Sequence, residues 1–188
     1  LSRLDRTLAL LTVGPLDRPE RLRTMRAAIA WSYDLLNDIE QALFRRLAVF
    51  EGGFSLDAAE AVAINPSDTR DHSPGPALKL PVSALDGVAS LIDKSLVLQV
   101  DTPGGEPRYR MLETIREFGL EVLVASGEER AIRSAHAAFA CIQATSLRAG
   151  LYSDDCENVL ARQELDNDNM RAALRWAATH PRAAPRRG

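Results

Sequence analysis

The sequence predicts a mainly α-helical fold that contains a single β-hairpin. Leu, Ala, Arg and Glu recur in long stretches with few β-branched runs, which favours helices. Apolar residues return every three or four positions along most of the chain, and between Leu96 and Met111 this period changes to two. The apolar fraction of 46% over 188 residues is sufficient for a buried core.

The first predicted helices lie in residues 22–64. Apolar residues at helical spacing predict a helix over about 22–36, after a linker rich in Gly and Pro. Asn37 stands three residues before Glu40, and Asp38 three residues before Gln41. Either can therefore be the N-cap of a second helix, which ends before Gly52-Gly53. A short Ala-rich helix is expected from Ser55 to about Ile64.

A surface loop over 65–81, which is rich in Pro, comes next. A further helix and the hairpin follow it. The helix begins at about Ser83, because Ser83 and Asp86 have the spacing of a capping pair. The hairpin covers 96–111, with its turn at Pro103-Gly104-Gly105. An isolated hairpin is marginal in water and must pack on something. Three helices roofed by a hairpin form a winged helix, and its expected core residues are Ile39, Leu47, Leu85, Ile92, Leu98 and Tyr109.

Three more helices are expected after the hairpin. They cover about 113–125, 128–149 and 153–178, and Gly127 and Gly150 separate them. The end of the chain, 180–188, is rich in Pro and Arg and is predicted to be disordered.

Composition excludes several classes of function. The net charge is −3 with both signs interspersed, which does not favour a nucleic-acid binder. The two cysteines, Cys141 and Cys156, are too few for a disulfide framework, and no apolar run is long enough to cross a bilayer, so we expect a cytoplasmic chain without membrane contact. The histidines are far apart, and we expect no metal site and no catalytic residue.

Four sequence blocks resemble bacterial STAND ATPases, the NB-ARC-like transcriptional regulators of LuxR and SARP type. In order, they are 23–36 (RTMRAAIAWSYDLL), 43–54 (LFRRLAVFEGGF), 91–97 (LIDKSLV) and 108–118 (RYRMLETIREF). A further block, 164–174 (ELDNDNMRAAL), is similar to the first tetratricopeptide-like (TPR-like) helix of such proteins. The resemblance implies four parts: the end of a small helical domain (1–36), a winged helix (37–126), the start of a TPR-like region (127–179) and the tail (180–188).

The resemblance also implies where a nucleotide would lie. The phosphate loop Gly-x4-Gly-Lys-Ser/Thr is absent, so we expect no ATPase activity and no cofactor in this chain. The parent protein is expected to bind ATP or ADP and to hydrolyse ATP. Relatives in apoptosome and plant resistance proteins have Met-His-Asp after the hairpin, and the His contacts ADP. Here the matching residues are Met111, Leu112 and Glu113, and Leu cannot donate a hydrogen bond to phosphate. Leu112 is then either a partly buried packing residue or a nucleotide-facing position whose missing donor Arg110 or Arg116 replaces, and the candidate nucleotide-facing positions are Arg110, Leu112 and Arg116.

Two functions remain open at this stage. In the first, the chain is a relay module that docks on the nucleotide-binding domain of its parent chain and couples the nucleotide state to repeats that sense a ligand or protein; DNA is then bound only through a separate domain. In the second, the winged helix binds DNA by itself through its third helix. That helix offers Asp86, Ser90 and Asp93 against Lys94, which disfavours contact with phosphates, although Arg108 and Arg110 of the hairpin help slightly.

Overall fold

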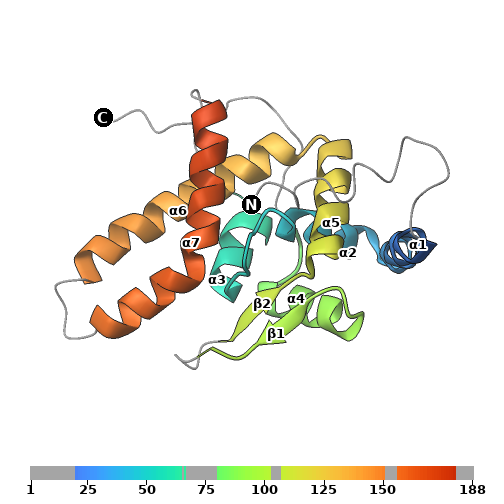
Figure 1. Ribbon diagram of the computed structural model, residues 1–188, viewed down its shortest axis with the longest axis horizontal. Coiled ribbons are helices and arrows are strands. Elements are labelled where there is room, and N and C mark those ends of the chain that lie inside the picture. The colour runs from blue at the N-terminus through green and yellow to red at the C-terminus, as the bar shows by residue number, and fades with distance from the viewer. Residues whose placement is uncertain (1–19, 65, 67–79, 103–106, 151–155, 181–188) are drawn as a thin grey trace.

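The computed structural model describes residues 20–64, 66, 80–102, 107–150 and 156–180, and Figure 1 shows that helices dominate it. The mainly α-helical fold class is therefore confirmed. In chain order the elements are α1 (Glu20–Asp34), α2 (Asp38–Leu47), α3 (Leu56–Ala59), the π-helical turn η2 (Glu60–Ile64), α4 (Ala84–Asp93), β1 (Leu98–Val100), β2 (Arg108–Arg110), α5 (Glu113–Ala125), α6 (Glu129–Gly150) and α7 (Cys156–Thr179).

Local capping sets the starts of α2 and α4. Asn37 is the N-cap of α2: its side chain accepts from the backbone N–H of Ile39 and Glu40, and the Glu40 carboxylate accepts from the Asn37 backbone N–H at 3.1 Å. Ser83 caps α4 by accepting from the backbone N–H of Asp86 at 3.1 Å. Both expected caps are confirmed, with Asn37 rather than Asp38 in the capping position.

The helices α2, α3–η2 and α4 pack together, and the two-stranded wing covers them (Figure 1). Strand β1 pairs antiparallel with β2, so that Leu98 faces Arg110 and Val100 faces Arg108. The predicted hairpin is confirmed; its expected turn at 103–105, and all but residues 66, 80 and 81 of the expected loop 65–81, lie outside the described residues. The largest fully buried side chains of this core are Phe44, Phe54, Leu43, Leu47, Ile64 and Leu91.

The expected core is only partly correct. Leu47 and Tyr109 are buried and Ile92 is partly buried, but Leu85 is 60% exposed, and Ile39 and Leu98 also lie at the surface. The physical reason is the close approach of α4 to α2. A Cβ added to Gly87 would lie 2.4 Å from Leu43 Cδ2, so the small residues of α4 face α2 and Leu85 is turned outward.

Helix α5 leaves the second wing strand and joins the core to α1. An aromatic cluster connects them, with Tyr33 centred 5.4 Å from Phe44 and 5.6 Å from Phe118. Arg26 of α1 also forms an ion pair with Glu121 of α5 at 2.6 Å. These contacts attach α1 to the winged helix through its last helix rather than through the wing.

The long helices α6 and α7 pack against each other, and α6 also packs on η2 of the winged helix (Figure 1). Of the tail expected to be disordered, 180–188, only His180 lies within the described residues. No helix in the described part of the chain is long and apolar enough to cross a membrane.

Candidate functional site

A pocket of about 230 Å³ lies where the wing meets α5, and all three candidate nucleotide-facing positions line it. Its walls come from three places: the end of α2 with the turn that follows, the end of β2, and the first turn of α5. Its lining residues are Leu47, Phe50, Gly52, Gly53, Phe54, Arg110, Met111, Leu112, Glu113 and Arg116. Leu47, Phe50 and Phe54 give it apolar surface, which we call its floor, and the charged groups come from the wing and α5.

The turn at Gly52-Gly53 shapes one wall of this pocket. Both glycines have positive φ, +78° and +119°. A Cβ on Gly53 would lie 2.9 Å from the backbone oxygen of Tyr109. This close approach lets Phe54 exchange two backbone hydrogen bonds with Tyr109, at 2.8 and 2.9 Å. The turn and the wing are therefore fixed to each other by backbone contacts, which sequence patterning did not indicate.

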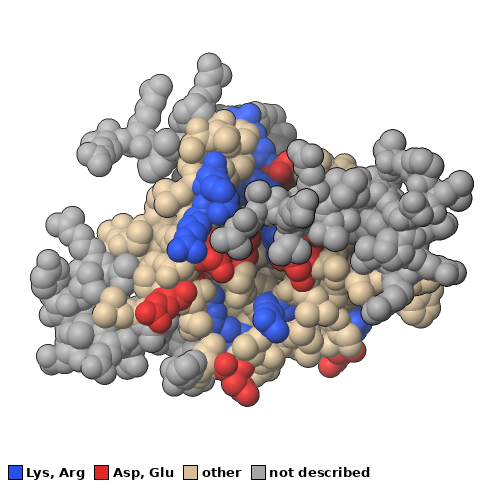
Figure 2. Space-filling view, viewed as in Figure 1, with Lys and Arg blue, Asp and Glu red and all other residues tan. Residues whose placement is uncertain are grey.

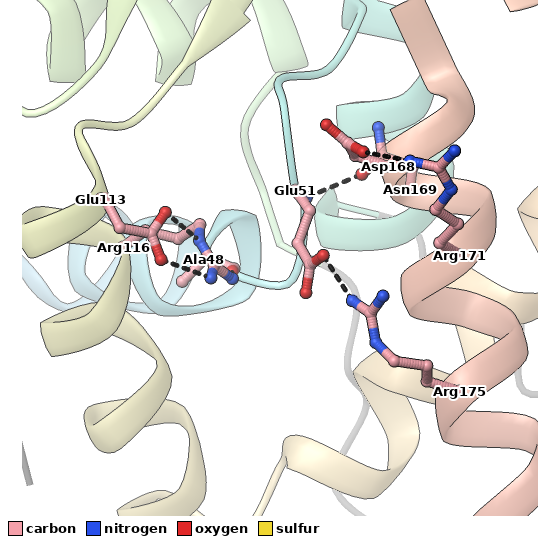
Figure 3. Close-up of polar contacts among 8 residues, drawn as sticks. All are labelled: Ala48, Glu51, Glu113, Arg116, Asp168, Asn169, Arg171 and Arg175. Carbon is pink, nitrogen blue, oxygen red and sulfur yellow. Dashed lines mark hydrogen bonds and ion pairs between the residues drawn. The ribbon is translucent and has the colours of Figure 1, made fainter. Parts of the chain in front are cut away.

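Arg116 is held inside the pocket wall. Its guanidinium donates to both oxygens of Glu113, at 3.0 and 2.7 Å, and to the backbone oxygen of Ala48 at 3.4 Å (Figure 3). Hydrogen bonds from Arg116 hold the pKa of Glu113 below its usual value, against the opposing effect of burial. Burial acts to lower the pKa of Arg116, and its acidic neighbours, Glu113 first, outweigh burial and raise it.

Arg110 and Leu112 are the exposed members of the site. Arg110 is exposed at the end of β2 and makes no ion pair with the described part of the chain. Leu112 is 48% exposed and is the N-cap of α5, where no side chain caps the helix. The first backbone N–H groups of α5 therefore lack a side-chain acceptor, and they carry the positive end of the helix dipole.

The arrangement suits an anion better than a reaction. Arg116 is neutralised by Glu113, which leaves the charge of Arg110 and the positive end of α5 beside an apolar floor. Such a combination attracts a phosphate or carboxylate group. Among the described residues, no group of three or more His, Cys, Asp or Glu could hold a metal ion.

Behind the double-glycine turn lies a second set of contacts that the sequence interpretation missed. Asn169 of α7 is buried; its side-chain amide donates to the Gly53 backbone oxygen at 2.7 Å, and its side-chain oxygen accepts from the Glu51 backbone N–H at 2.8 Å. Arg175 of α7 forms an ion pair with the Glu51 carboxylate at 2.5 Å (Figure 3). The only signal in the sequence was the block 164–174 itself, since the partners are more than a hundred positions apart.

The wing contributes to the same contacts. Arg108 donates to the Asp166 carboxylate at 2.6 Å and to the Gly53 backbone oxygen at 3.3 Å. We name the contacts of Asn169, Arg175 and Arg108 with residues 51–53 and Asp166 the α7 clasp. Arg108 is therefore occupied within the chain.

The third helix of the winged helix presents an acidic and apolar face. Asp86 and Asp93 are exposed, as expected, together with Leu85. Ser90 is half-buried rather than exposed, because its hydroxyl donates to Glu40, and Lys94 forms an ion pair with the same Glu40 at 2.9 Å. Figure 2 shows basic and acidic side chains interspersed over the described surface in view, without one broad basic area.

Comparison with known proteins finds relatives in mycobacteria. A protein of Mycobacterium tuberculosis (strain ATCC 25618 / H37Rv), "Putative HTH-type transcriptional regulator Rv0890c", is 41% identical over 93% of this chain, and its Mycobacterium bovis counterpart, Mb0914c, gives the same match. A second M. tuberculosis protein, "Uncharacterized protein Rv0894", is 40% identical over 61% of this chain and is covered over 26% of its length. No family model and no solved structure matches the chain. The chain spans 18% of the length of the regulators that it resembles.

Proposed function

We propose that this chain is the relay module of a larger transcriptional regulator. Its winged helix docks on a nucleotide-binding domain of the same parent chain and couples the nucleotide state to a helical-repeat sensor. Support comes from the relatives, which are named as transcriptional regulators. The chain covers 18% of their length, so they are larger proteins. The four blocks similar to STAND ATPases of LuxR and SARP type support the same assignment.

The observation that carries the proposal is the pocket. Leu112 was selected by its match to the family's motif, and Arg110 and Arg116 as charges near it in the sequence. All three line one pocket at the uncapped start of α5. A nucleotide held by the partner domain would present its phosphates to this opening, where Arg110 and the first N–H groups of α5 favour negative charge. Leu112 takes the place of the phosphate-contacting His, so the contact comes from Arg110 and the backbone.

The remaining parts of the proposal concern the parent protein. The parent binds and hydrolyses ATP in a domain outside this chain, and the chain itself has no catalytic role and no cofactor of its own. The pair α6–α7 begins a TPR-like array that senses a ligand or protein still to be identified. The parent acts in the cytoplasm and binds DNA through a separate domain.

The surface of α4 supports the proposal that a separate domain binds DNA. A recognition helix gains much of its affinity from Lys and Arg that contact phosphates. Here the exposed charges of α4 are Asp86 and Asp93, and the neighbouring Lys94 is paired with Glu40. Of the two wing arginines, Arg108 is bound to Asp166. Among the described basic residues of α4 and the wing, only Arg110 is left for an outside partner, which is too little for a DNA-binding surface.

The test is association with the nucleotide-binding fragment of the parent, measured by calorimetry without nucleotide, with ADP and with ATP. We expect binding that depends on the nucleotide, and at least about tenfold weaker binding for Arg110→Glu, a loss of about 1.4 kcal/mol or more. The matched control is Arg171→Glu, an exposed arginine of α7 whose partner is Asp168, and it should bind like the wild type.

A gel shift with random duplex DNA at low salt separates this function from the second candidate. The relay module should leave the DNA unshifted. Absence of association with the nucleotide-binding fragment would refute the proposal. A shift that weakens steeply with salt would instead assign DNA binding to the winged helix.

A further inference from the structure

The double-glycine turn has two faces, and different partners use them. Its front face, formed by Gly52 and Gly53, lines the pocket beside Arg116. Its back face lies against α7, where Asn169 bonds to the backbone on both sides of Gly52. Figure 3 shows the bond to Glu51. A single short segment therefore belongs both to the pocket and to the α7 clasp.

We propose that docking of α7 through Asn169 sets the shape of the pocket, so that Asn169 is a positioning residue for whatever the pocket binds. The two shortest bonds of Asn169 go to backbone atoms of the turn, the N–H of Glu51 and the C=O of Gly53. A longer one, at 3.4 Å, goes to the Asp166 carboxylate one turn earlier on α7. The two backbone bonds fix the Phe50–Glu51 and Gly53–Phe54 peptide units, one at each end of the turn. Two glycines at positive φ have few steric constraints of their own. The wing constrains the turn on one side, through Phe54 and Tyr109, and α7 constrains it on the other.

Two further contacts near Asn169 also hold the double-glycine turn in place. Arg108 bridges the Gly53 backbone oxygen and Asp166, which ties the wing, the turn and α7 together. A Cβ on Gly52 would lie 3.2 Å from Asp168 Oδ2, so α7 also approaches the turn closely at its tip. If α7 moved away, the turn would lose its polar partners on one side and the wall of the pocket would lose its fixed position.

The consequence is a reciprocal coupling, which rests on the anion-binding pocket proposed above. A docked α7 presents a formed pocket, so an anion binds with less cost of ordering. By linkage, an anion in the pocket strengthens the docking of α6–α7 by the same factor. Docking of the start of the repeat region and binding in the nucleotide-facing pocket would then be coupled through residues 51–53.

The first test needs no ligand. Amide spectra of the full chain are compared for the wild type, Asn169→Ala, Asn169→Asp and Arg171→Ala. Asn169→Asp keeps an acceptor for the Glu51 N–H but loses the donor to Gly53, and it serves if the Ala variant does not fold. We expect both Asn169 variants to shift the amides of Met111 and Leu112 and the Nε–H of Arg116, none of which contacts Asn169. Arg171→Ala, on the same turn of α7, should leave these three signals unchanged. Unchanged signals in a folded Asn169 variant would overturn the proposal.

The second test uses inorganic pyrophosphate as the probe, titrated into the same four proteins. The wild type and Arg171→Ala should bind alike, and the Asn169 variants should bind about fivefold or more weakly. Equal binding by all four would overturn the coupling while leaving the anion pocket intact. If the wild type does not bind pyrophosphate, the pocket assignment fails, and the amide shifts of the first test still decide whether α7 shapes the turn.

Discussion

Arg46 and Glu128 form an ion pair at 2.5 Å that joins the winged helix to the start of α6. Arg46 is buried on α2 and also donates to the Ala63 backbone oxygen at 3.0 Å, while Glu128 accepts a second bond from Arg45 at 2.6 Å. Burial raises the pKa of Glu128, but the hydrogen bonds from Arg46 and Arg45 outweigh burial and lower it. The pair therefore holds Glu128 ionised at the junction between the two halves of the chain.

Replacing Glu128 with Gln should reduce the free energy of unfolding by about 3 kcal/mol, because it removes the negative charge that pairs with the buried guanidinium of Arg46. Urea unfolding at pH 7 measures the loss. The matched control is Glu129→Gln, whose ion pair with Arg133 is half-exposed and should cost less than about 0.5 kcal/mol.

The pH dependence gives a second check on Glu128. A carboxylate whose pKa is lowered on folding contributes its full stability above 4.5, and the contribution is lost as the pH falls through the folded pKa. The difference between the wild type and Glu128→Gln should therefore shrink in acid. Equal costs for Glu128→Gln and Glu129→Gln at pH 7 would contradict the role given to the buried pair.

Replacing Gly53 with Ala should destabilise the chain by about 3 kcal/mol, since a left-handed φ and a close contact add together. The added Cβ would lie 2.9 Å from the Tyr109 backbone oxygen and would push the wing away from Phe54. Gly127→Ala is the control: its φ is +76° but no atom lies within 4 Å of the new Cβ, so only strain of about 1 kcal/mol remains. Thermal unfolding of the two variants measures the difference in stability. Similar losses of stability would show that the contact with Tyr109 does not contribute.

The elements that could be predicted from the sequence are those fixed by neighbours along the chain. The caps at Asn37 and Ser83 and the change to period two before β1 are local signals, and the structure confirms them. The orientation of α4 was predicted wrongly, because an apolar stripe counts Leu85 as a core residue and ignores Gly87. Helix packing favours the small residue at the closest approach, which only the position of Leu43 reveals.

The candidate site was predictable only in part, for a related reason. The resemblance selected Leu112, and Arg110 and Arg116 were chosen as nearby charges; all three line one pocket, although their role toward a nucleotide stays a prediction. The α7 clasp could not be found in this way. Asn169 bonds to a turn 116 positions earlier, and a buried Asn within a helix looks like any surface Asn until its partner is known.

His136 should make the chain less stable in mild acid. It is buried on α6, packs edge-on against Phe50 at 5.1 Å, and its Nε2 has no hydrogen-bond partner. Burial lowers its pKa from 6.5 to about 4, against the raising effects of Asn169, Glu51 and Asp166 and with a further lowering by Arg133. Between these two values the unfolded chain takes up a proton that the folded chain does not, so stability falls with falling pH, by about 3 kcal/mol over the whole window.

The measurement is urea unfolding at pH 7.5 and pH 5 for the wild type and His136→Gln, which cannot titrate. The wild type should lose about 2 kcal/mol more than the variant between these pH values. The exposed His180 supplies the control, and His180→Gln should follow the wild type. A wild-type pH dependence that His136→Gln fully retains would show that His136 is protonated as readily in the fold as in the unfolded chain.

Replacing Leu112 with His should strengthen the nucleotide-dependent association with the nucleotide-binding fragment of the parent. Leu112 is 48% exposed at the mouth of the pocket, so the substitution removes little buried surface and should change stability by less than about 0.5 kcal/mol. An imidazole at the uncapped start of α5 adds a hydrogen-bond donor beside Arg110, where the helix end and the arginine already favour an anion. Calorimetry with ADP should then show binding about threefold or more tighter for Leu112→His, while Leu112→Ala, which adds no donor, stays at the wild-type value. If both variants gain equally, relief of the Leu side chain and not a contact with phosphate is the cause, and the pocket does not face the nucleotide.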